Sequence, residues 1–412
     1  MTASDRRAVL LVTPNLEIGG AQENLATMAK YLPRTGFDVV VCTFEDGPLR
    51  DELDATGTPV VVLPGRRHGA LALPAFAAEM ARRRRDLRRL VVAHGIDVVQ
   101  TRGLGTLDFL VMTLRFGRPR VQVWWTIENV RFMVRREHLG RNAWLLGPKR
   151  AAHRALYRLG TRIVNGVVVV SDETARAFAR STRSRTRKVV VVPNGVDTER
   201  YPAPVDRARL RSELGLRPSH HAMIMVGTFK RQKGHVHLVR ALERLAPRFA
   251  DLRVLLAGDG ELRPEIERLV RDAGLADRVR FLGSRRDVPA LLAASDSFVL
   301  PSLWEGLPIA LVEAMASGLP VVATAVSGTS QVMVDGTTGW LVEPGQPDAL
   351  ADAIAELLRD PERARRMAAT GRERVNRWFS ARRQAEHLAS LFAGTAGAAP
   401  ARGALPVRAV AP

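Results

Sequence analysis

Two glutamates, Glu305 and Glu313, stand on either side of a Gly-Leu-Pro turn in the stretch WEGLPIALVEAM. Pro308 favours a helix start, because it lacks the N–H group that would stay unpaired there, so a helix is expected from Pro308 to about Ser317. The free N–H groups at that helix start attract an anion. Carboxylates repel an anion but accept hydrogen bonds from neutral hydroxyls. The pattern therefore predicts a ligand with a diphosphate between two hydroxyl-bearing groups, which is the layout of a nucleotide sugar.

Loops after other apolar runs carry cations and glycines. Lys230, Arg231 and Lys233 lie between the run AMIMVG and a helical pattern, an arrangement that suits a diphosphate. Gly19 and Gly20 follow the first apolar run, where they form either a close approach to a ligand or a plain turn. The sequence contains neither a G-x-G-x-x-G fingerprint after a strand nor a Walker A motif, which disfavours dehydrogenases and P-loop enzymes.

Short apolar runs rich in β-branched residues alternate with helical patterns along the chain. Runs that are apolar throughout are typical of strands buried on both faces of a parallel sheet. We expect strands at residues 8–14, 38–44, 59–64, 97–102, 121–127, 166–172 and 188–197, and then at 222–229, 253–260, 279–283, 297–302, 320–326 and 339–344. The two sets predict an α/β protein with two Rossmann-like, doubly wound domains that face each other across a cleft.

Prolines and glycines cluster between Asn194 and Pro204, which places the domain boundary there. We expect an N-terminal domain at 1–195 and a C-terminal domain at 196–375. The last helical pattern runs over 361–392, and its end, at 376–393, is expected to cross back to the N-terminal domain. The Ala/Pro/Gly-rich residues 394–412 predict a disordered tail.

The composition fits a soluble globular protein. No apolar run reaches the roughly 18 residues needed to span a bilayer, and the N-terminus passes directly into a strand pattern, so we expect a cytoplasmic location. The single cysteine, Cys42, lies in the apolar run FDVVVCTF and is interpreted as a buried core residue rather than a nucleophile.

Positive charge is concentrated in the first half of the chain. The net charge is +20, and residues 1–200 hold 33 Lys and Arg against 19 Asp and Glu. Clusters at 82–90, 134–141 and 180–188 either attract an anionic partner or are solvated helix faces. They lack interleaved aromatic residues and any known nucleic-acid motif, so no nucleic-acid partner is expected.

Several stretches, in this order and spacing, resemble a known family. They are IGGAQ, VVVVSDET, VVPNGVD, VGTFKRQKG, LLAGDGEL and the long run from VRFLG to GWLV. These resemble the GT-B fold, retaining glycosyltransferases of family 4 over residues 9 to about 392, most strongly over 190–345. The resemblance implies transfer of a hexose-type sugar from a nucleotide sugar, with retention at the anomeric carbon, in a cleft between an acceptor-binding and a nucleotide-sugar-binding domain.

The resemblance also implies roles for individual residues. Glu313 would bind the ribose hydroxyls, Glu305 the hydroxyls of the donor hexose, and Lys233 the phosphates. Gly19 and Gly20 match the N-terminal glycine loop. Backbone of the turn, at Gly306, Leu307 and Pro308, would line the diphosphate. The loop after VRFL, at Gly283, Ser284 and Arg285, would flank the base.

Two positions depart from the family pattern. Thr228 stands where relatives usually carry a phosphate-binding arginine, and Lys230 or Arg231 is the candidate replacement. Many relatives have a histidine after the strand VQVWWTI, where this chain has Glu128. Glu128 is therefore either a residue that orients the acceptor hydroxyl or a structural acid paired with Arg131.

The expected chemistry follows from the leaving group. A nucleoside diphosphate is stable as an anion, so its departure needs charge neutralisation more than a general acid. The resemblance implies same-face attack, in which a donor phosphate oxygen helps to remove the acceptor proton. The sequence has no D-x-D motif, and we expect no metal and no cofactor besides the donor, a UDP-sugar or GDP-mannose.

The acceptor is expected to be a glycan or a lipid-linked molecule, with a peripheral contact between the Arg82–Arg89 helix and anionic membrane as a hypothesis. Two alternatives remain: a nucleotide-sugar epimerase with the GT-B fold, and a basic binding protein for membrane or nucleic acid without catalysis.

Overall fold

The structure is a computed structural model of the chain. It describes residues 6–63, 73–102, 105–117, 119–129, 146–183 and 188–394. Nearly all of the predicted tail, from residue 395 onward, lies outside the described residues.

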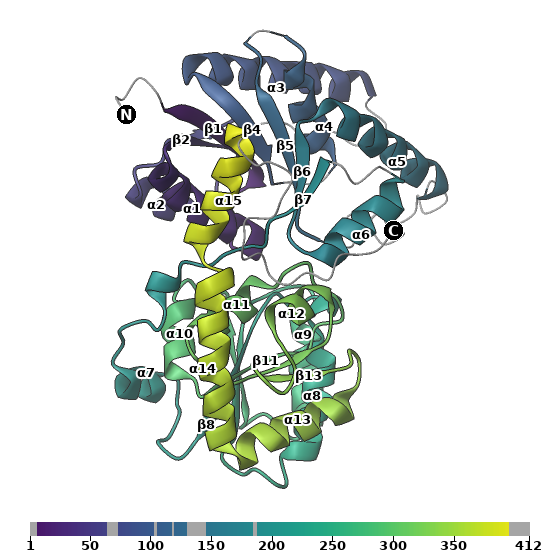
Figure 1. Cartoon of the computed structure of the whole chain (residues 1–412). Helices are drawn as coiled ribbons and strands as arrows, with labels where there is room; N and C mark the ends of the chain where they lie inside the picture. Colours follow the sequence, from purple (N-terminus) through teal and green to yellow (C-terminus); the bar gives the residue numbers. More distant parts are fainter. Residues whose placement is uncertain are drawn as a thin grey trace.

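Within the described residues, the N-terminal half forms a parallel sheet of seven strands in the order β3-β2-β1-β4-β5-β6-β7 (Figure 1). The strands are β1 (Arg7–Asn15), β2 (Phe37–Glu45), β3 (Val60–Val62), β4 (Ile96–Thr101), β5 (Gln122–Ile127), β6 (Gly166–Val169) and β7 (Val189–Val191). The helical segments between them are α1 (Gly20–Tyr31), η2 (Leu32–Thr35), α2 (Arg50–Ala55), α3 (Leu73–Ala93), α4 (Thr106–Met112), η3 (Thr113–Arg115), α5 (Leu146–Ile163) and α6 (Asp172–Thr182).

The C-terminal half, described without gaps from residue 196 to residue 394, forms a second parallel sheet in the order β10-β9-β8-β11-β12-β13. Its strands are β8 (His221–Val226), β9 (Leu252–Ala257), β10 (Val279–Gly283), β11 (Ser297–Leu300), β12 (Val321–Thr324) and β13 (Trp340–Val342). Its helical segments are η7 (Thr198–Arg200), α7 (Arg207–Glu213), η8 (Arg231–Lys233), α8 (His235–Leu245), α9 (Arg263–Asp272), α10 (Val288–Ala294), α11 (Ile309–Ala316), α12 (Ser327–Val332), α13 (Pro347–Arg359) and α14 (Pro361–Trp378). The predicted pair of doubly wound domains is confirmed.

Both faces of each sheet are covered, which explains why the strands are apolar throughout. Successive side chains of a strand point to opposite faces, so Val9 and Leu11 of β1 pack in one core and Leu10 and Val12 in another. Cys42 is fully buried in the second of these cores, and burial raises the pKa of its thiol to about 12. It is a core residue, as predicted.

The final helical pattern is not one continuous helix. α14 ends at Trp378, and α15 (Ala381–Ala393) begins after Ser380, whose side chain accepts a hydrogen bond from the N–H of Arg383. The helix predicted over 376–393 therefore starts later. At the break, the backbone pairs with the linker between the domains instead of continuing the helix: Val196 N–H donates to the Phe379 carbonyl, and Ala381 N–H donates to the Val196 carbonyl. α15 then packs on α1 of the N-terminal domain (Figure 1).

Candidate functional site

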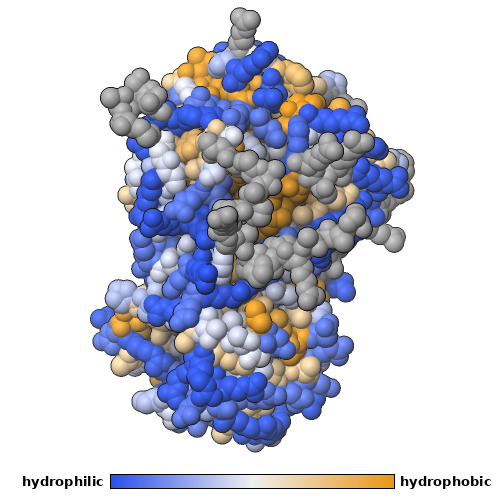
Figure 2. All heavy atoms as spheres, viewed as in Figure 1, coloured by the Kyte–Doolittle hydropathy of each residue, from blue (hydrophilic) through white to orange (hydrophobic). Residues whose placement is uncertain are grey.

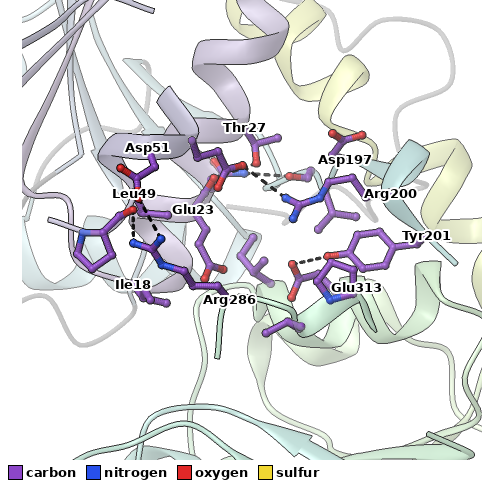
Figure 3. Close-up of a pocket in the computed structure, with 18 residues that line it drawn as sticks. Ile18, Glu23, Thr27, Leu49, Asp51, Asp197, Arg200, Tyr201, Arg286 and Glu313 are labelled. Carbon is purple, nitrogen blue, oxygen red and sulfur yellow. Dashed lines mark hydrogen bonds and ion pairs between the residues drawn. The ribbon is translucent and has the colours of Figure 1, made fainter. Parts of the chain in front are cut away.

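A cavity of about 320 Å³ lies between the two domains (Figure 3). Its walls come from α1 and the start of α2 in the N-terminal domain, from the linker 195–201, and from α10 and α11 in the C-terminal domain. Among the described residues, Glu313 is the one predicted site residue on its wall. The cavity therefore lies at the Glu313 end of the stretch that first suggested a site.

Glu313 faces a second acid across this cavity. It lies on α11 and accepts a hydrogen bond from the Tyr201 hydroxyl at 2.7 Å, while Glu23 lines the cavity from α1 (Figure 3). Burial raises the pKa of Glu313, and the Tyr201 hydroxyl and Arg200 oppose that rise. Burial and the charge of Glu313 raise the pKa of Glu23 to about 8. The raised pKa favours the protonated form of Glu23, in which its carboxyl group can donate a hydrogen bond.

Glu305 and Lys233 meet at the carboxyl edge of the C-terminal sheet. Lys233 Nζ donates to Glu305 Oε1 at 2.7 Å, and the Ser302 hydroxyl donates to the same oxygen at 2.7 Å. Gln232 Nε2 donates to Glu305 Oε2 at 3.0 Å. Glu305 is 4% exposed, and these three donors satisfy the hydrogen bonding of its buried carboxyl group. Two of the predicted catalytic residues thus pair directly with each other.

The side chain of Lys233 passes over Gly227 to reach Glu305. Lys233 ends the short helix η8, and its methylene groups lie about 3.3 Å from the place where a Cβ on Gly227 would stand. The neighbouring predicted residues Thr228, Lys230 and Arg231 are exposed on the same loop. They follow the carboxyl end of β8, between β8 and α8, which is where the sequence predicted a ligand-binding loop.

The start of α11 differs by one residue from the prediction. Pro308 is the residue before the helix rather than its first residue, because its ψ of 110° is extended and not helical. Leu307 and Pro308 are buried, whereas Ile309 is half-buried and lines the cavity. The helix start with its free N–H groups remains at the cleft, so the physical argument for an anion site is unchanged.

The two domains touch at this helix start. A Cβ on Gly306 would stand 1.8 Å from the Glu128 carbonyl oxygen of the N-terminal domain, so glycine is required for this close approach. A Cβ on Gly20 would lie 3.5 Å from the Ile309 side chain, which gives Gly20 an ordinary contact with α11. Gly19 precedes α1 as its N-cap in extended backbone. The glycine loop and the Gly-Leu-Pro turn therefore lie on opposite sides of one cleft.

Glu128 is tied into a buried network behind this contact. Arg102, directly after β4, donates through Nη1 to Glu128 Oε1 at 3.0 Å and to Asn24 Oδ1 at 2.5 Å. Asn24 in turn donates to Gly195 of the linker and to Gln384 of α15. The predicted alternative partner, Arg131, lies outside the described residues. The observed partner of Glu128 is Arg102, whose side chain is 1% exposed.

The loop after β10 places a different arginine on the cavity than the prediction chose. Gly283 ends β10 and Ser284 is exposed, while Arg285 makes a two-pronged pair with Asp287 at 2.7 and 2.6 Å. Arg286 lines the cavity and donates to Asp51 Oδ2 and to the carbonyl of Pro48, both in the N-terminal domain (Figure 3).

The basic helix α3 is partly neutralised by its own acids. Glu79 accepts from Arg82 and Arg83, and these bonds lower the pKa of Glu79 to about 2. The cluster at 134–141, and residues 184–187 of the cluster at 180–188, lie outside the described residues. Figure 2 shows hydrophilic residues over much of the visible face, with apolar areas at the top of the N-terminal domain. No helix in the described ranges combines the length and the apolar character needed to cross a membrane.

The neighbours of the predicted acids were missed in the sequence. They are Ser302 and Gln232 beside Glu305, Tyr201 and Glu23 near Glu313, and Arg102 and Asn24 beside Glu128. Ser302 and Arg102 each follow directly after or close behind a buried strand, which is a signal that sequence reasoning can use. The pairing of Tyr201 with Glu313 spans 112 positions and leaves no local signal.

Family models match both halves of the chain. Residues 206–374 match the model described as glycosyl transferases group 1, and residues 18–200 match the model described as glycosyltransferase family 4. The two matches meet near the linker between the sheets.

Two curated relatives align over most of their own length. The chain is 30% identical to the Escherichia coli UDP-Gal:alpha-D-GlcNAc-diphosphoundecaprenol alpha-1,3-galactosyltransferase, over 83% of this chain and 86% of the relative. It is 31% identical to the Mycolicibacterium smegmatis GDP-mannose-dependent alpha-(1-6)-phosphatidylinositol monomannoside mannosyltransferase, over 75% of this chain and 79% of the relative. For two further curated relatives, the matched region spans only 64% and 61% of their length.

A solved structure shares the fold. The chain superimposes on Anabaena Alr3699/HepE in complex with UDP and glucose with a TM-score of 0.79 and 23% identity, covering 94% of this chain and 100% of that one. With both domains matched by family models and a relative that is 30% identical over 83% of this chain and 86% of its own length, the chain belongs to the GT-B glycosyltransferases, in the family of glycosyl transferases group 1.

Proposed function

We propose that this chain transfers a hexose-type sugar from a nucleoside-diphosphate sugar to a hydroxyl of a glycan or lipid-linked acceptor, with retention of the anomeric configuration. The observation that carries the proposal is the placement of groups around α11. Glu305 and Lys233 meet before its first turn, and Glu313 stands on the cavity wall one turn inside it. Two carboxyl groups that can accept hydrogen bonds from hydroxyls thus flank a cation and a helix start. This order matches the order of ribose, diphosphate and hexose in a nucleotide sugar.

In this proposal Glu313 accepts hydrogen bonds from the ribose hydroxyls and Glu305 from the hydroxyls of the hexose. The diphosphate lies between them, against Lys233 and the N–H groups of Ile309 and Ala310. Backbone of the turn before α11 lines the diphosphate, and residues 283–285 flank the base. These roles are proposals for each side chain.

The proposed chemistry rests on charge neutralisation. As the bond to the sugar breaks, negative charge grows on the diphosphate, and a cation with oriented N–H groups stabilises that charge without reorganising. The acceptor hydroxyl attacks from the same face, and a donor phosphate oxygen takes its proton. Glu128, held by Arg102 beside the turn, is the proposed residue that orients the acceptor.

The names of the relatives narrow the proposed donor. The E. coli relative is named for UDP-galactose and the M. smegmatis relative for GDP-mannose. We therefore propose a UDP-sugar or GDP-mannose as donor, and an acceptor of the glycan or lipid-linked class that such names include.

A donor panel tests this function. Purified protein is incubated with UDP-, GDP- and ADP-sugars and a glycan or lipid-linked acceptor, with and without EDTA. Released nucleoside diphosphate is measured together with the anomeric configuration of the glycosylated acceptor. We expect turnover of a UDP- or GDP-sugar, unchanged by EDTA, and a retained product. Loss of turnover in EDTA that Mg²⁺ restores would refute metal independence. Conversion of the donor to an epimer without transfer would refute the transferase.

Peripheral contact with the inner face of the cytoplasmic membrane is a further part of the proposal. Helix α3 carries the arginines of 82–89 and exposes Phe76 and Val92, with 41% and 61% of their surface accessible. Anionic lipid would attract each arginine near its surface by about 1 kcal/mol.

Flotation with vesicles tests that contact. The protein is expected to float with vesicles that contain phosphatidylglycerol and to stay behind with neutral ones. The double variant Arg85→Glu, Arg89→Glu should float less on the anionic vesicles. Equal recovery on neutral and anionic vesicles would contradict the contact.

A further inference from the structure

Tyr201 occupies a buried position between the linker and the cavity. It is 6% exposed, and its ring packs in a core of the C-terminal domain together with Leu214, Leu307 and Leu311. Its hydroxyl leaves this core and donates to Glu313 Oε1 at 2.7 Å (Figure 3). A ring held on all sides presents its hydroxyl at one place, so the oxygen of Glu313 that it contacts is also fixed.

The hydroxyl acts on the charge of Glu313 as well as on its position. Two opposing sets of effects act on the pKa of Glu313: burial and the charge of Glu52 disfavour its ionised form, whereas the Tyr201 hydroxyl and Arg200 favour it. A hydrogen bond donated to a carboxylate stabilises the ionised form. An ionised carboxylate is acceptor-only, so both of its oxygens can accept from a diol, whereas a protonated carboxyl group uses one oxygen as a donor.

Tyr201 is also joined to the other domain by a short segment. Four residues earlier, Asp197 accepts hydrogen bonds from Tyr31 Oη at 2.7 Å and from Lys30 Nζ, both at the end of α1. The other end of α1 begins at the glycine loop on the cleft. The segment 197–201 therefore connects α1 of the N-terminal domain to Glu313 of the C-terminal domain through two hydrogen-bonded anchors.

We infer that Tyr201 is a positioning residue for the donor: its hydroxyl holds the Glu313 carboxylate in the orientation that accepts the two ribose hydroxyls. The inference rests on the proposed function, because it requires Glu313 to be the residue that contacts the ribose. It differs from a purely structural role in one consequence. A core tyrosine supports folding whatever the ligand, whereas a positioning residue decides whether the protein distinguishes a ribose with hydroxyls from one without them.

The test compares ribonucleotides with their 2′,3′-dideoxy analogues in the variant Tyr201→Phe, which keeps the ring and removes the hydroxyl. Affinities for UDP, GDP and ADP and for the matching dideoxy nucleotides are measured by calorimetry. The wild-type protein is expected to prefer the best ribonucleotide over its dideoxy form by about tenfold or more, since hydrogen bonds to a charged group are involved. In Tyr201→Phe this preference should fall below about threefold, with the dideoxy affinity little changed.

A second readout separates positioning from chemistry. In donor turnover, Tyr201→Phe should raise KM for the donor while kcat stays close to the wild-type value, because the lost contact exists in the ground state as well as in the transition state. Thermal unfolding of the variant shows whether the fold is retained.

Tyr31→Phe is the matched control. It also removes a tyrosine hydroxyl from this region, but that hydroxyl bonds Asp197 and not Glu313. Tyr31→Phe should keep the wild-type preference for the ribonucleotide. If it loses the preference as fully as Tyr201→Phe does, loosening of the linker explains both variants and the inference is overturned.

The outcomes also separate this inference from the proposed function. If the wild-type protein prefers ribonucleotides and Tyr201→Phe keeps that preference, Glu313 binds ribose without help and the inference alone is wrong. If the wild-type protein binds none of the three nucleotides, or binds the dideoxy forms equally well, the proposed donor site fails and the inference fails with it.

Discussion

Replacing Lys233 by alanine is expected to lower kcat by about 10²- to 10³-fold, the largest loss in the proposed site. The lysine is the cation nearest to Glu305, at 2.7 Å, in the loop that faces the start of α11. In the proposed reaction its charge counters the charge that grows on the leaving diphosphate. The change also leaves the buried carboxylate of Glu305 without its cation. Steady-state kinetics with the donor identified by the panel measures the effect.

Lys230→Ala is the control in the same loop. Lys230 is exposed, and it stands three residues before Lys233. Its removal takes away the same formal charge without touching Glu305, so a loss below about tenfold is expected, typical of a screened surface charge. Equal losses in both variants would mean that the loop acts through its overall charge. An unchanged kcat in Lys233→Ala would remove the lysine from the proposed mechanism.

The fold could be predicted because its signals are local. Each strand reads as an apolar run because both faces are covered, as Leu10 and Leu11 show by packing in different cores. The break at Ser380 could not be predicted in the same way. The residues around it are compatible with a continuous helix, whereas at the break Phe379 and Ala381 form backbone hydrogen bonds with Val196, which is far away in sequence.

The same distinction between local signals and distant contacts holds for the candidate site. The sequence singled out Glu305, Glu313 and Lys233 as candidates because their residue types and their positions after buried strands are typical of a ligand site. It did not identify the contacts that these residues make with distant segments: Lys233 lies 72 positions from Glu305, and Tyr201 lies 112 positions from Glu313. Such pairs form only when the sheets and the linker are assembled.

These contacts change how the acids should be understood. The sequence presents two carboxylates and a lysine as three groups waiting for one ligand. In the structure the lysine and Glu305 already neutralise each other, and Tyr201 already occupies one oxygen of Glu313. A buried group without a partner is costly, so these contacts keep the site folded before a ligand arrives. A diphosphate would then share Lys233 with Glu305 rather than meet an isolated cation.

Replacing the two glutamates is expected to change different kinetic parameters. Glu313→Gln should raise KM for the donor about 10- to 100-fold with kcat little changed, because a ribose contact is equally present in the ground state and the transition state. Glu305→Gln should lower kcat about 10²-fold with a smaller change in KM. Glutamine keeps the size of the side chain but removes the charge that holds Lys233, and it places an amide where Gln232 now donates.

Measuring both parameters for both variants is therefore more informative than either activity alone. The contrast follows from position: Glu313 lies on the cavity wall with Tyr201, whereas Glu305 lies with the lysine that must stabilise the leaving group. Nucleotide binding by calorimetry provides the independent check, since Glu313→Gln should weaken UDP or GDP and Glu305→Gln should affect it less. If both variants keep the wild-type donor affinity and rate, the assignment of this stretch as the donor site is wrong. If the two patterns are exchanged, the sugar and the ribose lie at opposite ends from those proposed.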